Sequence, residues 1–173
     1  APSEPKLDQT LKPAAILLPI IEREEPSVLL TKRSDDMPTH AGQISFPGGR
    51  FHAGDASLVE TALRELEEET GIGREFVTVA GFLDPYETVN SGFMILPVVG
   101  FVGEGFTPHV NANEVAEVFE APLQYLCDPE NRRLMSVERQ GVMREFHTIP
   151  FAGHTIWGAT AEIIVNLSGR LCR

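Results

Sequence analysis

The chain has 173 residues and a formal net charge of −11, because 14 Lys and Arg stand against 25 Asp and Glu. This length suits a single domain, 1–173, with an adequate core. The acidic balance argues against nucleic acid or an anionic membrane as a partner, since both require a basic surface. It leaves room for a small anionic substrate, which metal ions and a few local cations can bind.

Cysteine usage and hydropathy indicate the compartment. Cys127 and Cys172 are the two cysteines, and they do not form a CxxC pair. No secretory signal is recognised at the start, and no apolar run reaches the ~20 residues that span a bilayer. We therefore expect a reduced, cytoplasmic protein that does not bind a membrane.

The first third of the chain predicts an arm and a hairpin. Residues 1–13 are polar and rich in proline, which favours an arm on the surface. The apolar run 14–21 predicts a buried strand, and 28–32 predicts a second strand that pairs with it.

A carboxylate-rich helix is expected after the glycine pair Gly48 and Gly49. Ser57 and Glu60 have the spacing of a capping box, in which each side chain bonds the backbone N–H of the other residue. Gly71 suits the left-handed conformation that ends many helices. The apolar stripe that faces a sheet consists of Val59, Ala62, Leu63 and Leu66.

Glu65, Glu68 and Glu69 stand at i, i+3 and i+4 of this helix, so their carboxylates share a face. A divalent cation such as Mg²⁺ prefers oxygen ligands and would relieve their mutual repulsion. Arg64 can orient one of these carboxylates through its forked donors. Gly48 allows a backbone carbonyl to approach the same ion. The alternative is an acidic helix face that only contacts water.

The remaining segments predict strands, a short helix and a final long helix. Residues 76–83 and 93–102 read as strands, and 111–122 contains a strand-like segment. The last expected elements are a helical turn at 123–127, a hairpin at 132–149 around Gln140 and Gly141, and a helix at 156–170 with Ile163, Ile164 and Leu167 inward.

The order of residues from Arg64 to Ile72, RELEEETGI, resembles the Nudix box of the Nudix hydrolases. That pattern has a glutamate six positions after the glycine, where this chain has Asp55. One additional residue then separates Asp55 from Arg64. A longer loop leaves the helix unchanged, so the resemblance assigns catalytic roles to Arg64, Glu65, Glu68 and Glu69 rather than to Asp55. It assigns the metal to Gly48, Glu65, Glu68 and Glu69.

The stretch 29–49 is similar to the signature of a Nudix subgroup that hydrolyses coenzyme A. The matching residues are Leu29, Leu30, Thr31, Arg33, Ser34, Gly42, Phe46, Pro47, Gly48 and Gly49. Pro38 occupies the position where that subgroup carries an arginine, and Arg33, Lys32 or Arg50 would have to compensate. This resemblance implies substrate-binding roles for Arg33, Ser34, His40, Gln43 and Arg50. A hydrogen-bonding role within its own loop is the alternative for His40.

Two later segments extend the resemblance. Thr88, Phe93 and the run 97–100 are similar to a Thr-Gly-Tyr segment and Pro-Val-Val-Gly in the subgroup, so Thr88 and Phe93 are further expected substrate contacts. Tyr86 and Phe93 suit stacking on adenine, although aromatics near a strand are often core. Many Nudix enzymes carry one more carboxylate outside the box, and Glu114 is our expected residue for that role.

The resemblance implies an α/β fold, an α/β/α sandwich with a mixed β-sheet between helices. It implies an enzyme that uses Mg²⁺ or Mn²⁺ to hydrolyse a nucleotide substrate, coenzyme A first, into 3′,5′-ADP and 4′-phosphopantetheine. Glu68, Glu69 or Glu114 is expected to take the proton of the attacking water, and the sequence leaves the three alternatives open. A homodimer is common in that family. The alternatives are a different nucleoside diphosphate substrate, such as ADP-ribose, a sugar nucleotide or a nucleoside triphosphate, and a nucleotide-binding module without catalysis.

Overall fold

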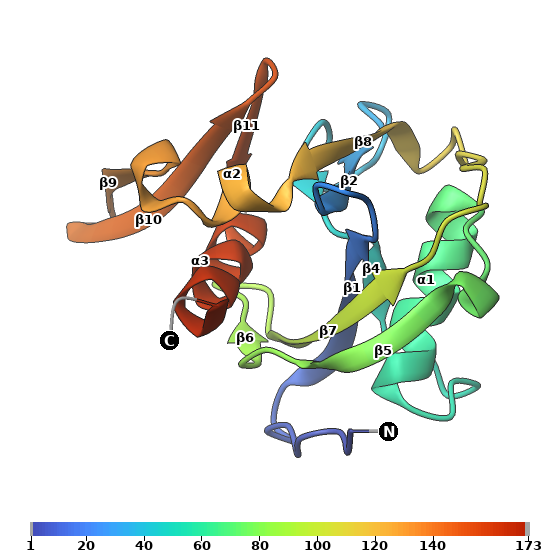
Figure 1. Cartoon of the computed structure of the whole chain (residues 1–173). Helices are drawn as coiled ribbons and strands as arrows, with labels where there is room; N and C mark the ends of the chain where they lie inside the picture. The colour runs from blue at the N-terminus through green and yellow to red at the C-terminus, as the bar shows by residue number, and fades with distance from the viewer. Residues whose placement is uncertain (1, 172–173) are drawn as a thin grey trace.

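A computed structural model describes residues 2–171 as an eight-stranded sheet with helices on both sides, next to a smaller three-stranded sheet (Figure 1). The larger sheet contains β1 (Lys12–Ile21), β2 (Ser27–Arg33), β3 (Ile44–Ser45), β4 (Gly48–Arg50), β5 (Val77–Phe82), β6 (Tyr86–Glu87), β7 (Phe93–Val102) and β8 (Val115–Pro122). The smaller sheet contains β9 (Arg133–Arg139), β10 (Val142–Phe151) and β11 (His154–Trp157). The helices are α1 (Leu58–Thr70), α2 (Leu123–Cys127) and α3 (Ala159–Leu171), with short 3₁₀ turns η1 (Arg74–Phe76) and η2 (Pro129–Asn131).

The larger sheet is mixed. Its main path runs β3-β2-β1-β7-β5, with β8 on β2, β4 on β1 and β6 on β7. The strands β1 and β7 are parallel from Lys12 opposite Phe93 to Ile21 opposite Val102. The other pairs of this sheet are antiparallel.

The central strand β1 supplies two cores, because successive side chains point to opposite faces of a sheet. Leu17 and Ile21 pack with Leu66 of α1 on one face. Leu18 and Ile20 pack with residues of α3 and of the smaller sheet on the other face. Figure 1 shows α1 and α3 on opposite sides of the sheet. This is why β1 reads as a continuous apolar run.

The short strand β4 places the glycine pair next to α1. The pairing of β2 with β1 is confined to Ile20 opposite Val28 and Ile21 opposite Ser27. On the other half of β1, β4 pairs instead, with Ala15 opposite Gly49 and Ile16 opposite Gly48. The main sheet therefore holds Gly48 and Gly49 in fixed register.

Most elements lie where the sequence predicts them, and the start of the last helix differs from its prediction. The hairpin of β1 and β2, the strand β7, the helical turn α2 and the hairpin of β9 and β10 are all present. The expected helix 156–170 begins later, at Ala159, because Ile156 pairs with Ile149 as part of β11. Gly158, with a φ of 66°, separates that strand from α3.

Two points concern the ends of the chain and the membrane. The arm is shorter than predicted, because Lys12 and Pro13 already belong to β1. Cys172 lies outside the described residues. Within residues 2–171, no helix has both the length and the apolar character needed to cross a bilayer.

Candidate active site

Both ends of α1 are fixed by local hydrogen bonds. The Ser57 hydroxyl oxygen accepts the Glu60 N–H at 3.2 Å, and Gly71 ends the helix at a φ of 70°. The reciprocal half of the predicted capping box is not formed, because the Glu60 carboxylate pairs with Arg74 at 2.6 Å. Glu4 of the N-terminal arm accepts the Val59 N–H at 2.7 Å instead. The helix that carries the carboxylates therefore begins and ends at defined residues.

The three predicted helix carboxylates separate into a buried pair and an exposed one. Glu65 is 8% exposed and Glu69 is 6% exposed, and they share the face that packs towards the sheet. The Glu68 side chain is 52% exposed. The structure thus brings Glu65 and Glu69 together beneath β4 and leaves Glu68 at the rim.

The two glycines of β4 permit this close approach. A Cβ atom on Gly49 would lie 2.3 Å from Oε1 of Glu65, and a Cβ atom on Gly48 would lie 2.5 Å from the Ala15 carbonyl oxygen. Neither position has room for a side chain. Gly48 also provides a backbone hydrogen bond that stabilises the Glu69 carboxylate.

Arg64 connects the helix to the loop before it. Its Nε donates to Oδ1 of Asp55 at 2.9 Å and its Nη2 donates to Oδ2 at 3.1 Å. Its Nη1 donates to Glu65 at 2.8 Å and to Glu68 at 3.2 Å. The Arg64 guanidinium is thus a clamp that fixes Glu65 relative to the loop.

Asp55 is a site residue that the sequence analysis set aside. Besides Arg64 it accepts the Thr61 hydroxyl at 2.8 Å and the His52 N–H at 3.0 Å. These hydrogen bonds, foremost that of Arg64, hold the pKa of Asp55 well below its ordinary value. The signal was present in the sequence as the one acidic residue between the glycine pair and the helix cap.

Burial and like charge destabilise the ionised forms of the buried pair. Burial, together with the nearby charges of Glu65 and Glu114, raises the pKa of Glu69 to about 8, although the Gly48 backbone and Arg33 oppose the shift. Burial also raises the pKa of Glu65, although Arg64 opposes this. A cation bound at this point would favour both charged forms.

Glu114 reaches the same region from another part of the chain. The Asn111 N–H donates to the Glu69 carbonyl at 3.3 Å, and the Ser34 N–H donates to the Glu114 carbonyl at 2.9 Å. These bonds hold the segment before β8 between the ends of α1 and β2. The carboxylate of Glu114 acts on Glu65 and Glu69 through its charge.

Arg33 carries an unsatisfied donor. Its Nε is buried and has no hydrogen-bond partner among residues 2–171. Its positive charge lowers the pKa of Glu69, against the larger effect of burial. A buried donor without a partner is costly, and an anionic ligand would satisfy it.

Ser34, His40 and Gln43 serve the loop between β2 and β3. The Ser34 hydroxyl oxygen accepts the Asp36 N–H at 3.3 Å. His40 is exposed with a φ of 57°, and its carbonyl accepts the Gln43 N–H at 3.2 Å. The carbonyl of Gln43 in turn accepts the Arg33 N–H at 2.9 Å. This bond of His40 is made by its backbone, so the roles of its side chain in nucleotide binding or in the loop both stay predictions.

Arg50 and Phe93 lie on the opposite face of the sheet from Glu65. Gly49 points towards α1, so its neighbour Arg50 points away from it. The Arg50 guanidinium lies 5.0 Å from the Phe93 ring centre, and the Lys12 ammonium lies 5.7 Å from it. The hydroxyl of Thr88 is engaged in its own turn, where it accepts the Phe93 N–H at 3.0 Å. The predicted contacts therefore form two groups on two faces.

The donor chemistry fits a divalent cation, although no closed cage exists. Within the described part of the chain, no three acidic, histidine or cysteine side chains are gathered closely enough to enclose an ion. Mg²⁺ keeps several waters and takes substrate phosphate oxygens as ligands, so a few protein carboxylates are sufficient. Glu65 and Glu69 are the residues best placed to hold it.

Comparison with known proteins identifies the family. The NUDIX domain model matches residues 10–146. The chain belongs to the Nudix family. It is 44% identical to the Nudix hydrolase NudL of Yersinia enterocolitica over 155 residues, which cover 90% of this chain and 79% of that protein. It is 39% identical to NudL of Photorhabdus laumondii over 167 residues, which cover 96% and 89%.

Solved structures confirm the Nudix fold. A MutT/nudix protein of Enterococcus faecalis superposes with a TM-score of 0.60 at 18% identity, covering 98% of this chain and 65% of that one. The NUDIX domain of Shewanella oneidensis NrtR, crystallised with ADP ribose, superposes with a TM-score of 0.58 at 17% identity, covering 98% and 94%. The predicted α/β fold with a mixed sheet between helices is thereby confirmed, and the protein is a Nudix hydrolase.

Proposed function

We propose that this Nudix hydrolase cleaves the diphosphate of a nucleoside diphosphate derivative, with coenzyme A as the preferred substrate. The observation that carries the proposal is the buried pair Glu65 and Glu69 beneath the glycines of β4. Two acidic side chains in such a position have an unfavourable charge unless a cation joins them. Mg²⁺ or Mn²⁺ held there would neutralise phosphate charge during displacement by water.

Different residues would bind the metal ion and the substrate phosphate. Glu65 and Glu69 would hold the ion from α1, and Arg64, which Asp55 fixes, keeps Glu65 oriented. The buried Nε of Arg33 suits a phosphate oxygen of the substrate, because guanidinium groups bind phosphate in a planar, directed geometry. Arg33 would thereby replace the arginine that is absent at the exposed Pro38.

We assign Glu114 as the base that takes the proton of the attacking water. Glu65 and Glu69 are expected to hold the ion, and Glu68 is joined to Arg64 at the rim. Glu114 lies outside α1 and close enough to act on both buried carboxylates through its charge. Water adds to phosphorus, one P–O bond of the diphosphate breaks, and two phosphomonoesters leave. Replacing such a base typically lowers the rate by about 10²- to 10⁴-fold.

The test is turnover of coenzyme A against ADP-ribose, a sugar nucleotide and nucleoside triphosphates, with Mg²⁺, with Mn²⁺ and with a chelator. We expect metal-dependent release of 3′,5′-ADP from coenzyme A as the fastest reaction. The Glu114→Gln variant should bind metal normally and lose turnover. Absence of turnover on the whole panel, in a folded protein that binds nucleotide, would instead favour a binding module.

A second candidate substrate class follows from Pro38. Proline offers neither a charge nor an N–H at the position where the coenzyme A subgroup carries arginine. If Arg33 does not compensate, ADP-ribose or a sugar nucleotide should exceed coenzyme A in kcat/KM. The same panel decides between the two classes.

A further inference from the structure

Strand β9 forms an edge of the smaller sheet. Within residues 2–171 it pairs with β10 alone, because the strand order is β11-β10-β9. All 7 of its residues are exposed. Figure 1 shows the β9–β10 hairpin projecting away from the larger sheet. The outer side of β9 is therefore accessible to another chain.

The hairpin turn determines which backbone groups of β9 point outward. The two-residue turn 140–141 has φ angles of 54° and 75°. In a turn of this kind the two flanking residues exchange backbone hydrogen bonds, and the pattern alternates along the strand. The N–H and C=O groups of Leu134, Ser136 and Glu138 thus point away from β10. Within the described part of the chain, none of the three forms a backbone hydrogen bond outside the hairpin ladder.

Other strands with one neighbour carry features that obstruct pairing, and β9 does not. Strand β8 ends in Pro122, and the pairing of β5 with β7 is irregular between Val79 and Gly81. Prolines and bulges at an edge prevent the addition of a further strand. Strand β9 pairs with β10 without a shift in register, and its central residues 134–137 are uncharged. Such an edge is a template for strand addition.

Exposed apolar side chains gather around this edge. Of the 10 large apolar side chains exposed within residues 2–171, 6 belong to the smaller sheet. On β9 itself Leu134 is 57% exposed, Met135 is 45% exposed and Val137 is 39% exposed. Concentrations of apolar surface on a monomer mark sites of protein association.

The charges of β9 restrict how it can pair with a second copy of itself. Two identical antiparallel strands related by a two-fold axis place one residue opposite its own copy. With Ser136 at the axis, Arg133 would face Arg139, and like charges directly opposite each other destabilise a sheet. With Val137 at the axis, Arg139 would face Met135, and no opposite charges would meet.

A pairing with Met135 at the axis brings opposite charges together. Glu138 of one copy then faces Arg132 of the other, and Arg139 lies next to Glu130. The two-fold axis repeats each of these contacts. Glu130 and Arg139 are exposed, and neither forms an ion pair with any residue from 2 to 171. The strand is therefore complementary in charge to its own copy in this register.

We propose that two copies of this chain form a dimer by pairing their β9 strands antiparallel about Met135, which joins two three-stranded sheets into one of six strands. Residues 132–148 carry 4 arginines against 2 glutamates, in a chain with a net charge of −11. A contact through this hairpin keeps the acidic parts of the two copies apart. The inference is independent of which nucleotide the enzyme hydrolyses.

The sharpest test is disulfide cross-linking of a Met135→Cys variant that also carries Cys127→Ser and Cys172→Ser. Residue 135 meets its own copy at the axis, where facing Cβ atoms are about 4.5–5.5 Å apart, close to the range of a disulfide. We expect mild oxidation to produce a covalent dimer on non-reducing gels. Met143→Cys in the same background is the matched control, because Met143 is exposed but belongs to β10. No cross-link at position 135, or equal cross-linking at both positions, would overturn the proposal.

Sedimentation equilibrium measures the dimer without a covalent bond. We expect the wild type to dimerise and Ser136→Pro to weaken the dimer by about 10- to 100-fold, because the lost N–H donates only between copies. Ser136→Ala retains that N–H and should dimerise as the wild type does. A wild type that stays monomeric at every concentration would overturn the proposal, and so would equal dimerisation of Ser136→Pro.

A charge exchange tests the register. Arg139→Glu places a second acid beside Glu130 and should weaken the dimer by about 3- to 10-fold. Combining it with Glu130→Arg should restore the wild-type affinity, and a double variant as weak as Arg139→Glu would contradict pairing about Met135. None of these measurements requires turnover, so failure of the dimer and failure of the proposed function are distinguishable.

Discussion

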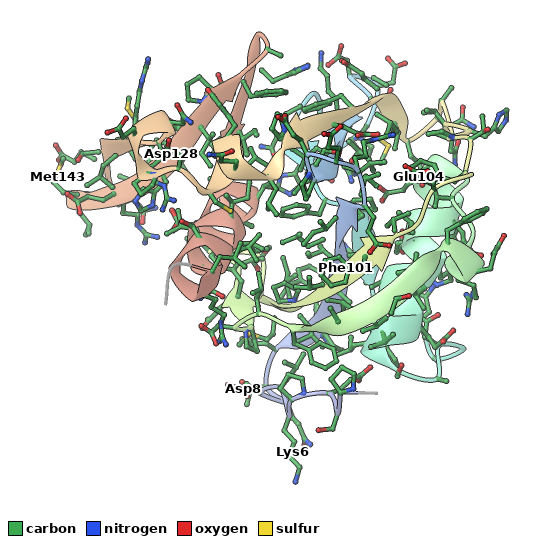
Figure 2. The ribbon with its side chains drawn as sticks, in the orientation of Figure 1. Lys6, Asp8, Phe101, Glu104, Asp128 and Met143 are labelled. Atoms are coloured by element: carbon green, nitrogen blue, oxygen red, sulfur yellow. The ribbon has the colours of Figure 1, made fainter. Side chains whose placement is uncertain are left out.

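The carboxylates of α1 and the charged side chains of the β9–β10 hairpin differ in their exposure to solvent. Beneath β4, Glu65 and Glu69 are buried, and a Cβ atom on Gly49 would collide with the Glu65 carboxylate. Every residue of β9 is exposed, and Figure 2 shows Met143 at the far end of the hairpin, away from the main sheet. The buried region therefore has little room for substitution, whereas the hairpin strand β9 is open to solvent.

Among the substitutions considered, Gly49→Ala in the buried region should lower activity the most. The added methyl group would lie 2.3 Å from Oε1 of Glu65, which Arg64 holds in place. We expect metal-dependent turnover to fall by roughly 100-fold, the typical effect of a shift of about 1 Å in a catalytic group. Gly54→Ala is the control, because a Cβ atom there meets nothing within 4 Å. Equal turnover of the two variants would show that the approach of Gly49 to Glu65 is unimportant.

Asp55→Asn tests the clamp around Arg64. Loss of the paired hydrogen bonds should lower turnover by about 10- to 100-fold, as for other residues that orient metal ligands. The wild-type pair stabilises the fold above the ordinary Asp pKa of 3.8 and loses this effect as the pH falls towards the lowered pKa of Asp55. The variant should therefore lose less unfolding free energy between pH 5 and pH 2, as thermal melts recorded across that range would show. Identical acid profiles would contradict the assignment.

Glu69→Gln should stabilise the metal-free protein. Because the folded protein raises the pKa of Glu69 to about 8, the wild type loses stability as the pH rises from 4.5, its ordinary value, to about 8. At pH 8 in chelator we expect a Tm above that of wild type by about 2–4 °C for each kcal/mol gained. At pH 4.5 the two proteins should melt together. Equal melting temperatures of the two proteins at pH 8 in chelator would contradict this prediction.

The smallest effect is expected on the hairpin. Met143→Thr should change the unfolding free energy by less than about 0.5 kcal/mol, because the side chain is exposed. Ile156→Ala, in the same small sheet but fully buried, should cost about 2–5 kcal/mol. A large loss in Met143→Thr, measured by chemical denaturation, would mean that the hairpin face is covered by a partner or a second copy.

Local signals predicted the helix and most strands from the sequence. Ser57 and Gly71 mark the ends of α1 through contacts within a few residues, and the apolar run of β7 requires no partner to be recognised. The buried carboxylates were also predictable, because their spacing on α1 is set by the helix itself.

Features that depend on distant partners could not be predicted. Ile156 became a strand residue through its pairing with Ile149, and Glu4 caps a helix 54 residues away. Arg50 and Phe93 lie on the face opposite Glu65 because β4 pairs with β1 in one particular register. The pattern of apolar and polar residues in the sequence does not specify which residues of β4 and β1 pair.

The measurement that tests the account most directly is Mn²⁺ binding, followed by electron paramagnetic resonance, in the wild type and in Glu69→Gln. Glu138→Gln, an exposed carboxylate on the hairpin, serves as the control. The account predicts that Glu69→Gln weakens Mn²⁺ binding by about tenfold or more, while the control binds as the wild type does. Equal Mn²⁺ affinity in Glu69→Gln and wild type would contradict the claim that the buried carboxylates beneath β4 form the metal site.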